Sequence, residues 1–369
     1  MNAIHRLFSF VLCATTAMLL LLANVYAQSK DTNTCAMLAG SFTPNISMQI
    51  KAADQSHQMI QREIYAACLQ TRGKQGASRT TAPGQAGTNA ANAGDLVTFD
   101  PPGSTSTIPT AINPAGTVTG SFIDAGALVH SFLRTSGGTI TQFDPPGATC
   151  SVSTQTECSA AVGITPDGTI VGGYAAGLLF RGYLRAPSGA FTLFDPPGSQ
   201  STFPSAINPA WTVTGGFADS AGRGHGFLRA PNGTFTTFDP LGSTSTGATA
   251  INPAGTVTGV FIDVRGVFHG FLRTSDGTIT AFDASADSQI TFANAINPAG
   301  TTVGEFFTTA GFEHGFLRAP NGAITVFDAP GSLFTFPTGI NPAGTVTGNF
   351  FPPEFFPDHG FVGRPKNMR

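Results

Sequence analysis

The sequence repeats itself about every 44 residues, and this period restricts the possible folds more than any other feature. Two short sequence motifs recur once in each repeat: Ile followed by Asn-Pro or Thr-Pro, and His-Gly-Phe or a close variant. A fixed period of this length is typical of propellers and solenoids, in which each repeat is one supersecondary unit. The period is set by the dipeptide Phe-Asp, whose copies are 44, 51, 44, 44 and 45 residues apart and begin at Phe99, Phe143, Phe194, Phe238, Phe282 and Phe327.

Each repeat divides into four short stretches of strand-like sequence, represented by TAIN, TVTGxF, HGFLR and TITxFD. The segments between them have the composition of tight turns. In N-P-A-G and A-P-N-G, Pro suits the second turn position and Gly suits a left-handed one. With 45 Gly and 26 Pro, the chain is also a poor helix former. Four strands in about 44 residues match one blade of a β-propeller.

The two ends of the repeat array complement each other. The array opens with a lone fourth strand, residues 96–100, and closes with the first three strands of a repeat, residues 339–362. The N-terminal strand can therefore complete the last blade and remove an open sheet edge. An open solenoid, the main competing architecture, would carry capping units instead. We therefore expect an all-β, six-bladed β-propeller of four-stranded blades, closed by the N-terminal strand and preceded by a short helical segment.

The charge balance excludes several functional classes. The chain has 18 Lys and Arg against 21 Asp and Glu, a net charge of −3, so it lacks the positive surplus of a nucleic-acid-binding protein. Its 41% apolar content excludes a charge-rich disordered chain. Phosphate-binding loops, the G-x-S-x-G elbow and the H-E-x-x-H motif are missing from the sequence. We predict no cofactor, no metal site and no catalytic residue, and we leave the question of enzymatic activity open.

The N-terminal region predicts export. Residues 1–27 have a basic start, an apolar stretch and small residues before Gln28, as in a secretory signal peptide; a membrane anchor is the alternative. No later segment is apolar enough to cross a membrane, so we expect a secreted or periplasmic bacterial protein. Residues 28–70 predict a small helical segment, 71–95 a flexible linker, 96–363 the propeller and 364–369 a tail.

Four cysteines remain outside the signal peptide, and an even number in an exported chain favours disulfides. The pairs closest in sequence are Cys35 with Cys68 and Cys150 with Cys158, and we expect these two bonds. The sequence does not exclude a zinc site, but it offers neither a C-x-x-C motif nor a nearby His pair.

The IN-x-x-G-x-V-x-G stretches and the tripeptides that begin at His130, His225, His269, His314 and His359 resemble the HAF family of bacterial extracellular repeats. The resemblance covers about residues 96–363. The middle residue departs from the family's His-Ala-Phe, because it is Gly or Ser. The resemblance implies export and a repeat fold, and it carries no activity or catalytic residue.

The turn between the third and fourth strands fixes their register. A three-residue loop at Pro231–Gly233 places His225 opposite Asp239, and Arg181 replaces the histidine opposite Asp195 in the second repeat. We interpret these pairs as structural, because near-copies around a ring belong to the scaffold. The same count predicts the pairs His130–Asp144, His225–Asp239, His269–Asp283, His314–Asp328 and, across the ring closure, His359–Asp100.

The connections from fourth to first strand and from second to third strand vary most between copies, and both fall on one face of a propeller. Acidic and aromatic residues in these loops suit recognition of a glycan or an extracellular protein, although the aromatic rings could instead pack over the blade ends. We expect a non-enzymatic binding module. A polysaccharide-active hydrolase or lyase that uses loop carboxylates is the alternative, and a structural surface-layer component is a third possibility. The candidate ligand-binding residues are Asp124, Asp219, Asp263, Glu313, Glu354, Phe355, Phe356 and Asp358.

Overall fold

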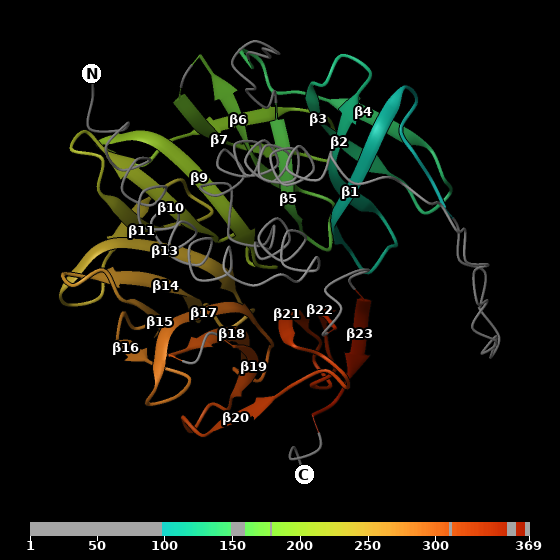
Figure 1. Cartoon of the computed structure of the whole chain (residues 1–369). Coiled ribbons are helices and arrows are strands. Elements are labelled where there is room, and N and C mark those ends of the chain that lie inside the picture. Colours follow the sequence, from blue (N-terminus) through green and yellow to red (C-terminus); the bar gives the residue numbers. More distant parts are fainter. Residues whose placement is uncertain (1–97, 149–158, 178, 310–311, 353–358, 366–369) are drawn as a thin grey trace, which may run out of the picture.

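The computed structural model describes residues 98–148, 159–177, 179–309, 312–352 and 359–365. Within these ranges the strands form six successive antiparallel groups, which we call units 1 to 6 in chain order; units 1, 2 and 3 are separate four-stranded sheets, and single parallel pairs join units 4, 5 and 6 into one 11-stranded sheet. Figure 1 shows the units following one another around a common centre, so that unit 6 returns to the side of the molecule where unit 1 lies. The architecture is all-β and supports a β-propeller, and the described residues contain no helix.

In every unit the strands follow one another as a meander. The first strands are β1 (Ser104–Ile112), β5 (Ser159–Ile164), β9 (Ser199–Ile207), β13 (Ser243–Ile251), β17 (Ser288–Ile296) and β21 (Phe334–Ile340). The second strands are β2 (Val118–Asp124), β6 (Ile170–Ala176), β10 (Val213–Asp219), β14 (Val257–Asp263), β18 (Thr302–Thr308) and β22 (Val346–Phe351). The third strands are β3 (Val129–Arg134), β7 (Leu179–Arg185), β11 (Gly224–Arg229), β15 (Phe268–Arg273), β19 (Glu313–Arg318) and β23 (His359–Gly363). The fourth strands are β4 (Ile140–Phe143), β8 (Phe191–Phe194), β12 (Phe235–Phe238), β16 (Ile279–Phe282) and β20 (Ile324–Phe327).

A bulge in the first strand explains the glycine of the recurring Val-Thr-Gly. In unit 3 the pairing of β9 with β10 shifts between Pro204 and Ala206, which brings a carbonyl close to β10. A Cβ atom at Gly215 would lie 2.2 Å from the oxygen of Phe203, so only glycine fits there. The same close approach recurs at the corresponding glycine of every unit.

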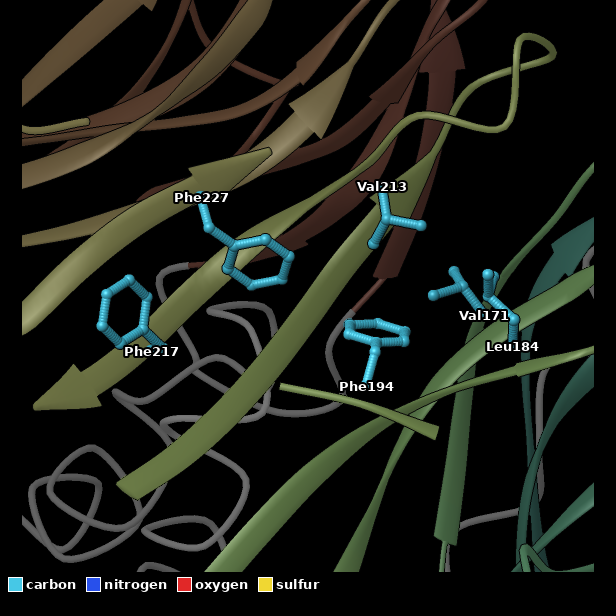
Figure 2. Close-up of a cluster of buried hydrophobic side chains, with 6 residues drawn as sticks. All are labelled: Val171, Leu184, Phe194, Val213, Phe217 and Phe227. Carbon is cyan, nitrogen blue, oxygen red and sulfur yellow. The ribbon is translucent and has the colours of Figure 1, made fainter. Parts of the chain in front are cut away.

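Phenylalanine and arginine side chains join each unit to the next. Phe194 at the end of unit 2 lies edge-on to Phe227 of unit 3, with ring centroids 6.4 Å apart, and the Arg229 guanidinium stacks over Phe194 at 5.2 Å. Val171 and Val213 complete this apolar cluster (Figure 2). Because the same arrangement recurs at the next junctions, the core consists of layers between successive units.

A second chain of contacts runs through the turns between first and second strands. The Asn208 amide donates to the carbonyl of Asn252 at 3.3 Å, and Asn252 donates to Asn297 at 3.3 Å. Asn113 likewise donates to the carbonyl of Thr165 at 3.3 Å. Thr165 stands where the other units have asparagine, so it has no amide with which to continue the chain to unit 3.

The start of the array differs from our expectation in one respect. Thr98 to Asp100 are not in a strand, and in the described part of the chain β23 pairs with β22 alone. The remainder of the expected closing strand, the expected signal peptide, the 28–70 segment and the linker lie outside the described residues, as do all five cysteines.

Candidate functional site

The structure brings together four of the five expected histidine–aspartate pairs. On β11 and β12, Gly226 pairs with Phe238, so His225 lies opposite Asp239. The Arg181 guanidinium takes the histidine's place in unit 2, 3.0 Å from Asp195. The distances from Nδ1 to the carboxylate are 2.7 Å for His130–Asp144, 2.7 Å for His225–Asp239, 2.8 Å for His269–Asp283 and 2.9 Å for His314–Asp328.

The fifth expected pair is not formed by the described residues. His359 is exposed and lies against Phe350, with ring centroids 5.3 Å apart. Asp100 accepts a hydrogen bond from Thr107 at 2.6 Å. Among the described residues β23 pairs with β22 alone, so no strand on its other side holds Asp100 in register with His359.

Three of the candidate ligand-binding carboxylates lie on the far side of these histidines. The distance from histidine Nε2 to the second carboxylate is 3.5 Å for Asp124, 3.4 Å for Asp219 and 3.6 Å for Asp263. Each carboxylate also accepts backbone N–H groups of the turn that follows it. Leu128 donates to Asp124 at 2.8 Å, and Val267 donates to Asp263 at 2.9 Å. These aspartates therefore hold the turn between second and third strands, as Asx turns do.

Hydrogen bonds to the carboxylates keep these groups ionised. The backbone N–H of Leu128 lowers the pKa of Asp124, and that of Val267 lowers the pKa of Asp263. Burial acts in the opposite direction at Asp219, but hydrogen bonds from Arg223 and His225 outweigh it and lower the Asp219 pKa to about 2. At His225 burial alone would lower the imidazole pKa, but hydrogen bonds to Asp239 and Asp219 outweigh burial and raise it.

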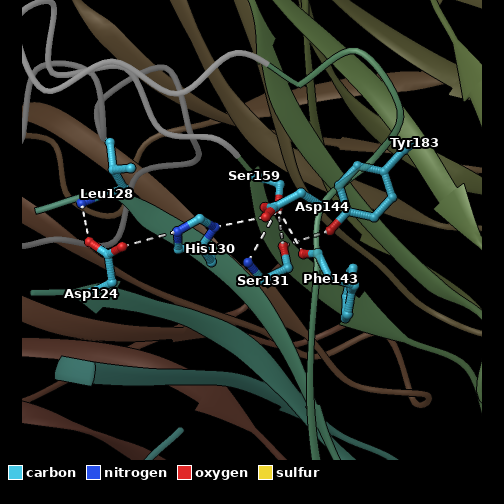
Figure 3. Close-up of polar contacts among 8 residues, drawn as sticks. All are labelled: Asp124, Leu128, His130, Ser131, Phe143, Asp144, Ser159 and Tyr183. Carbon is cyan, nitrogen blue, oxygen red and sulfur yellow. Dashed lines mark hydrogen bonds and ion pairs between the residues drawn. The ribbon is translucent and has the colours of Figure 1, made fainter. Parts of the chain in front are cut away.

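One of the pairs extends into a buried hydrogen-bond chain between units 1 and 2 (Figure 3). Ser159 donates to Asp144 at 2.7 Å, and its hydroxyl lies 2.7 Å from that of Ser131. The Tyr183 hydroxyl is 3.0 Å from Ser131 Oγ, and burial raises the Tyr183 pKa, so this phenol stays protonated. Ser131 and Tyr183 replace a glycine and a phenylalanine of the other units, so two departures from the repeat meet at one point.

The geometry of this chain is structural rather than catalytic. A serine nucleophile needs its hydroxyl against the imidazole and open to substrate. Ser159 instead bonds to the carboxylate of Asp144, and both Ser131 and Ser159 are fully buried.

Two aromatic residues near the variable connections belong to strands and are buried. Phe203 of β9 packs on Phe180 of β7 with centroids 5.5 Å apart, and Phe336 of β21 packs on Phe351 of β22 at 5.6 Å. Both Phe203 and Phe336 are therefore part of the packing within and between units. Four candidates, Glu354, Phe355, Phe356 and Asp358, lie outside the described residues.

Two apolar side chains that we did not predict are exposed on the same face. Leu241, in the loop into unit 4, is fully exposed, and Val264, in the β14–β15 turn, is 79% exposed. Both belong to connections at the same end of unit 4: Leu241 is two residues before Ser243, Val264 follows Asp263, and Ser243 and Asp263 are cross-strand partners. Leu241 stands where other copies have proline, and this substitution was the available sequence signal.

Glu313 lies elsewhere than the sequence suggested. We expected it in an exposed loop, but it begins β19 and is 2% exposed. Glu305 on β18 is equally buried. Both carboxyls face the junction between units 5 and 6, where neither is open to a ligand.

Within the described ranges, no group of three His, Cys, Asp or Glu residues lies close enough together to hold a metal ion. The same ranges hold no apolar helix of membrane-spanning length.

The structure was compared with known proteins. No family model matches the chain, and no curated protein matches its sequence. A puromycin-hydrolysing peptidase from Mycobacterium tuberculosis superposes with a TM-score of 0.51 at 15% identity, over 72% of this chain and 43% of the peptidase. A putative TolB from Agrobacterium tumefaciens gives 0.45 at 15% identity, over 70% and 90% of the two chains. A streptogramin B lyase gives 0.44 at 14% identity, over 71% and 94%. At these identities the likeness concerns the fold alone.

Proposed function

We propose that this chain is an exported, non-enzymatic repeat protein of the HAF type, whose six units are the blades of a closed propeller. Its ligand, a glycan or an extracellular protein, binds to the face formed by the second-to-third and fourth-to-first connections. The observation that carries the proposal is the exposed pair Leu241 and Val264, held at one edge of that face by fixed turns. Exposed apolar side chains on a rigid scaffold mark interaction sites.

Closure of the propeller is supported by a comparison of one glycine of unit 6 with its counterpart in unit 3. In unit 3 a Cβ atom at Gly226 would lie 2.5 Å from the aromatic ring of Phe238, so this side chain occupies the space that a larger residue at position 226 would need. Among the described residues no aromatic ring lies over Gly360 of unit 6, and the nearest atom to its Cβ position is the Gly348 oxygen at 3.9 Å.

The aromatic ring of Phe99 would cover Gly360 in the same way as Phe238 covers Gly226. It already lies 5.7 Å from Phe132 and beneath Arg134 at 4.9 Å, as Phe238 lies against unit 4. Residues 96–100 would therefore bring Phe99 onto Gly360 as the fourth strand of unit 6.

The positions of the loop carboxylates favour binding over catalysis. Asp124, Asp219 and Asp263 each hold a backbone turn, and a carboxylate that is committed to its own loop is a poor general acid or nucleophile. The alternative of a polysaccharide hydrolase or lyase would have to use residues other than these three.

Binding can be tested with the full chain on a glycan array, in parallel with a panel of extracellular proteins. The test variant is Leu241→Ser with Val264→Ser. The control is Leu193→Ser, which removes a half-exposed apolar side chain from the outer strand β8. We expect a specific ligand whose binding falls at least tenfold in the double variant and is unchanged in the control. Equal loss in both variants, or a ligand that the double variant binds as well as the parent, would overturn the proposed face.

A further inference from the structure

The junction between units 5 and 6 contains two glutamates side by side. On β18 and β19, Glu305 pairs with Gly315 and Phe307 pairs with Glu313. Glu305 and Glu313 are therefore diagonal neighbours on one face of the sheet. That face is turned toward unit 6, because Glu313 pairs with Phe334 of β21 and a Cβ atom at Gly315 would meet Pro337 at 2.9 Å.

An asparagine connects this pair to the next unit. The Asn294 amide on β17 donates one hydrogen bond to Glu305 at 2.8 Å and another to the carbonyl of Pro337 at 2.9 Å. Both amide hydrogens are then used, so Asn294 has no donor left for Glu313. The contact between the two units thus depends on a buried polar cluster.

No cation faces the two glutamates from the strands packed against them. In the described residues, β17 and β21 contain no titratable side chain, and β18 contains only Glu305. The cations of β19 are His314 and Arg318, which lie on its opposite face. His314 bonds to Asp328 at 2.9 Å, and Arg318 stacks over Phe282 of unit 4 at 4.9 Å.

Two buried carboxyls without a cation cannot both ionise cheaply, because burial and mutual repulsion penalise the charged forms. Burial raises the pKa of Glu305 to about 8. Burial, reinforced by the charge of Glu305, raises the pKa of Glu313 well above its usual range. The two groups titrate as a pair, and the pair retains protons at a pH where an exposed glutamate would have none.

At two other junctions the corresponding contact is apolar. Phe268 takes the place of Glu313 in unit 4, and it packs on Phe292 of unit 5 at 5.6 Å. Phe180 packs on Phe203 in the same way between units 2 and 3. An aromatic contact of this kind does not change with pH, whereas a contact built on two carboxyls does.

We propose that the junction between units 5 and 6 is a pH-controlled contact, closed while Glu305 and Glu313 share at least one proton and loosened when both are ionised. Unit 6 is then held firmly in acid and released in alkali, independently of whether the loop face binds a ligand. The folded state retains protons that the unfolded state loses above about pH 4.5, so this junction loses stability as the pH rises toward 8 and beyond.

Hydrogen exchange measured by mass spectrometry over pH 5.5 to 9.5 tests the proposal, with β9–β11 as an internal reference for the intrinsic rate. We expect the protection of residues 334–351, relative to the reference, to fall as the pH rises from 5.5 through the raised pKa values of the pair, by on the order of tenfold per unit of pH for each proton released on opening, and to level off once both carboxyls are ionised. Glu305→Gln with Glu313→Gln should abolish this fall, because neutral amides of the same size replace both carboxyls. Asp276→Asn, an exposed carboxylate on unit 4, is the matched control and should keep it.

Two outcomes would contradict the proposal. One is a parent protein whose unit 6 has the same relative protection at every pH. The other is a double glutamine variant that still loses protection with rising pH. Should the double variant fail to fold, Glu305→Gln and Glu313→Gln are made singly and followed by circular dichroism against pH. Each keeps one buried carboxyl, so we expect a smaller loss with rising pH than in the parent, and a loss equal to the parent's in both single variants would contradict the proposal.

Discussion

Trp211 of unit 3 and Asp167 of unit 2 face each other across the boundary between the two units. Burial raises the pKa of the Asp167 carboxyl, but hydrogen bonds from the hydroxyls of Thr165 and Thr169 and, to a smaller extent, the Trp211 indole outweigh burial and lower it. This contact lies where Thr165 interrupts the chain of asparagine contacts. Trp211 adopts a φ of 63°, in the left-handed region where the other units have glycine, and it remains 42% exposed. Strain of this kind persists only where the surroundings stabilise it. The tryptophan thus supplies a polar contact between units 2 and 3 where the asparagine chain is interrupted.

A double-mutant cycle can measure this compensation. Trp211→Gly relieves backbone strain but loses the polar contact with Asp167, whereas in an Asp167→Ala background only the strain is left to relieve. We therefore expect the glycine substitution to be more favourable in that background, by a coupling free energy of about 1–2 kcal/mol in chemical denaturation. Strictly additive effects would show that the two side chains do not act together.

Ring closure makes a prediction about Gly360. In the described contacts a methyl group there meets nothing nearer than 3.9 Å, so Gly360→Ala would be harmless if the array stayed open. If Phe99 covers Gly360 in a closed ring, the substitution should cost about as much as Gly270→Ala, whose Cβ would lie 2.7 Å from Phe282. We expect both variants to lose about 1–3 kcal/mol in urea unfolding. A neutral Gly360→Ala beside a destabilised Gly270→Ala would exclude closure by this strand.

The bulge in the first strands predicts a sharp difference between two glycines. Gly215→Ala would place its methyl group 2.2 Å from the Phe203 carbonyl oxygen, so the backbone must move and we expect a loss of more than about 3 kcal/mol. Gly247 on β13 has open space at its Cβ position, and Gly247→Ala should be neutral or slightly stabilising. Thermal unfolding of the two variants provides the measurement. A similar melting temperature for both would contradict the packing described.

The pH dependence of His225 follows from its two carboxylate neighbours. Burial alone would lower the His225 pKa, but hydrogen bonds to Asp239 and Asp219 outweigh it and raise the pKa above 6.5. The stabilisation is therefore complete below that value and is lost as the pH rises through the raised pKa. Asp239→Asn should lower the His225 pKa in an NMR titration, whereas Asp276→Asn should leave it unchanged. An unaltered titration of His225 in the first variant would remove the electrostatic interpretation of the pair.

The strand order, the hairpin register and the facing of His225 and Asp239 could be predicted from the sequence, because all three depend on local turn chemistry repeated many times. The turn-holding role of Asp219 was also readable in principle, since an aspartate precedes a glycine by three residues in both units 3 and 4. It was missed because a carboxylate in a variable loop suggests a ligand before it suggests a backbone contact.

The burial of Glu305 and Glu313 could not be read in this way. Each glutamate lies within a strand, but the residues that enclose the pair, such as Asn294 and Pro337, come from other strands and from the next unit. Such burial depends on packing between units, about which the period of the sequence carries no information.

The stacking of Phe194 on Phe227 beneath Arg229 has a consequence for how this gene can change. Because almost every junction uses the same three kinds of side chain, a segment that runs from one Phe-Asp to the next brings both halves of its own interface with it. Duplication or loss of a whole segment would join surfaces that already fit. The number of repeats can therefore change without the need for a new type of contact between units. Only the geometry of the contact between the first and the last unit of a closed array would limit that number.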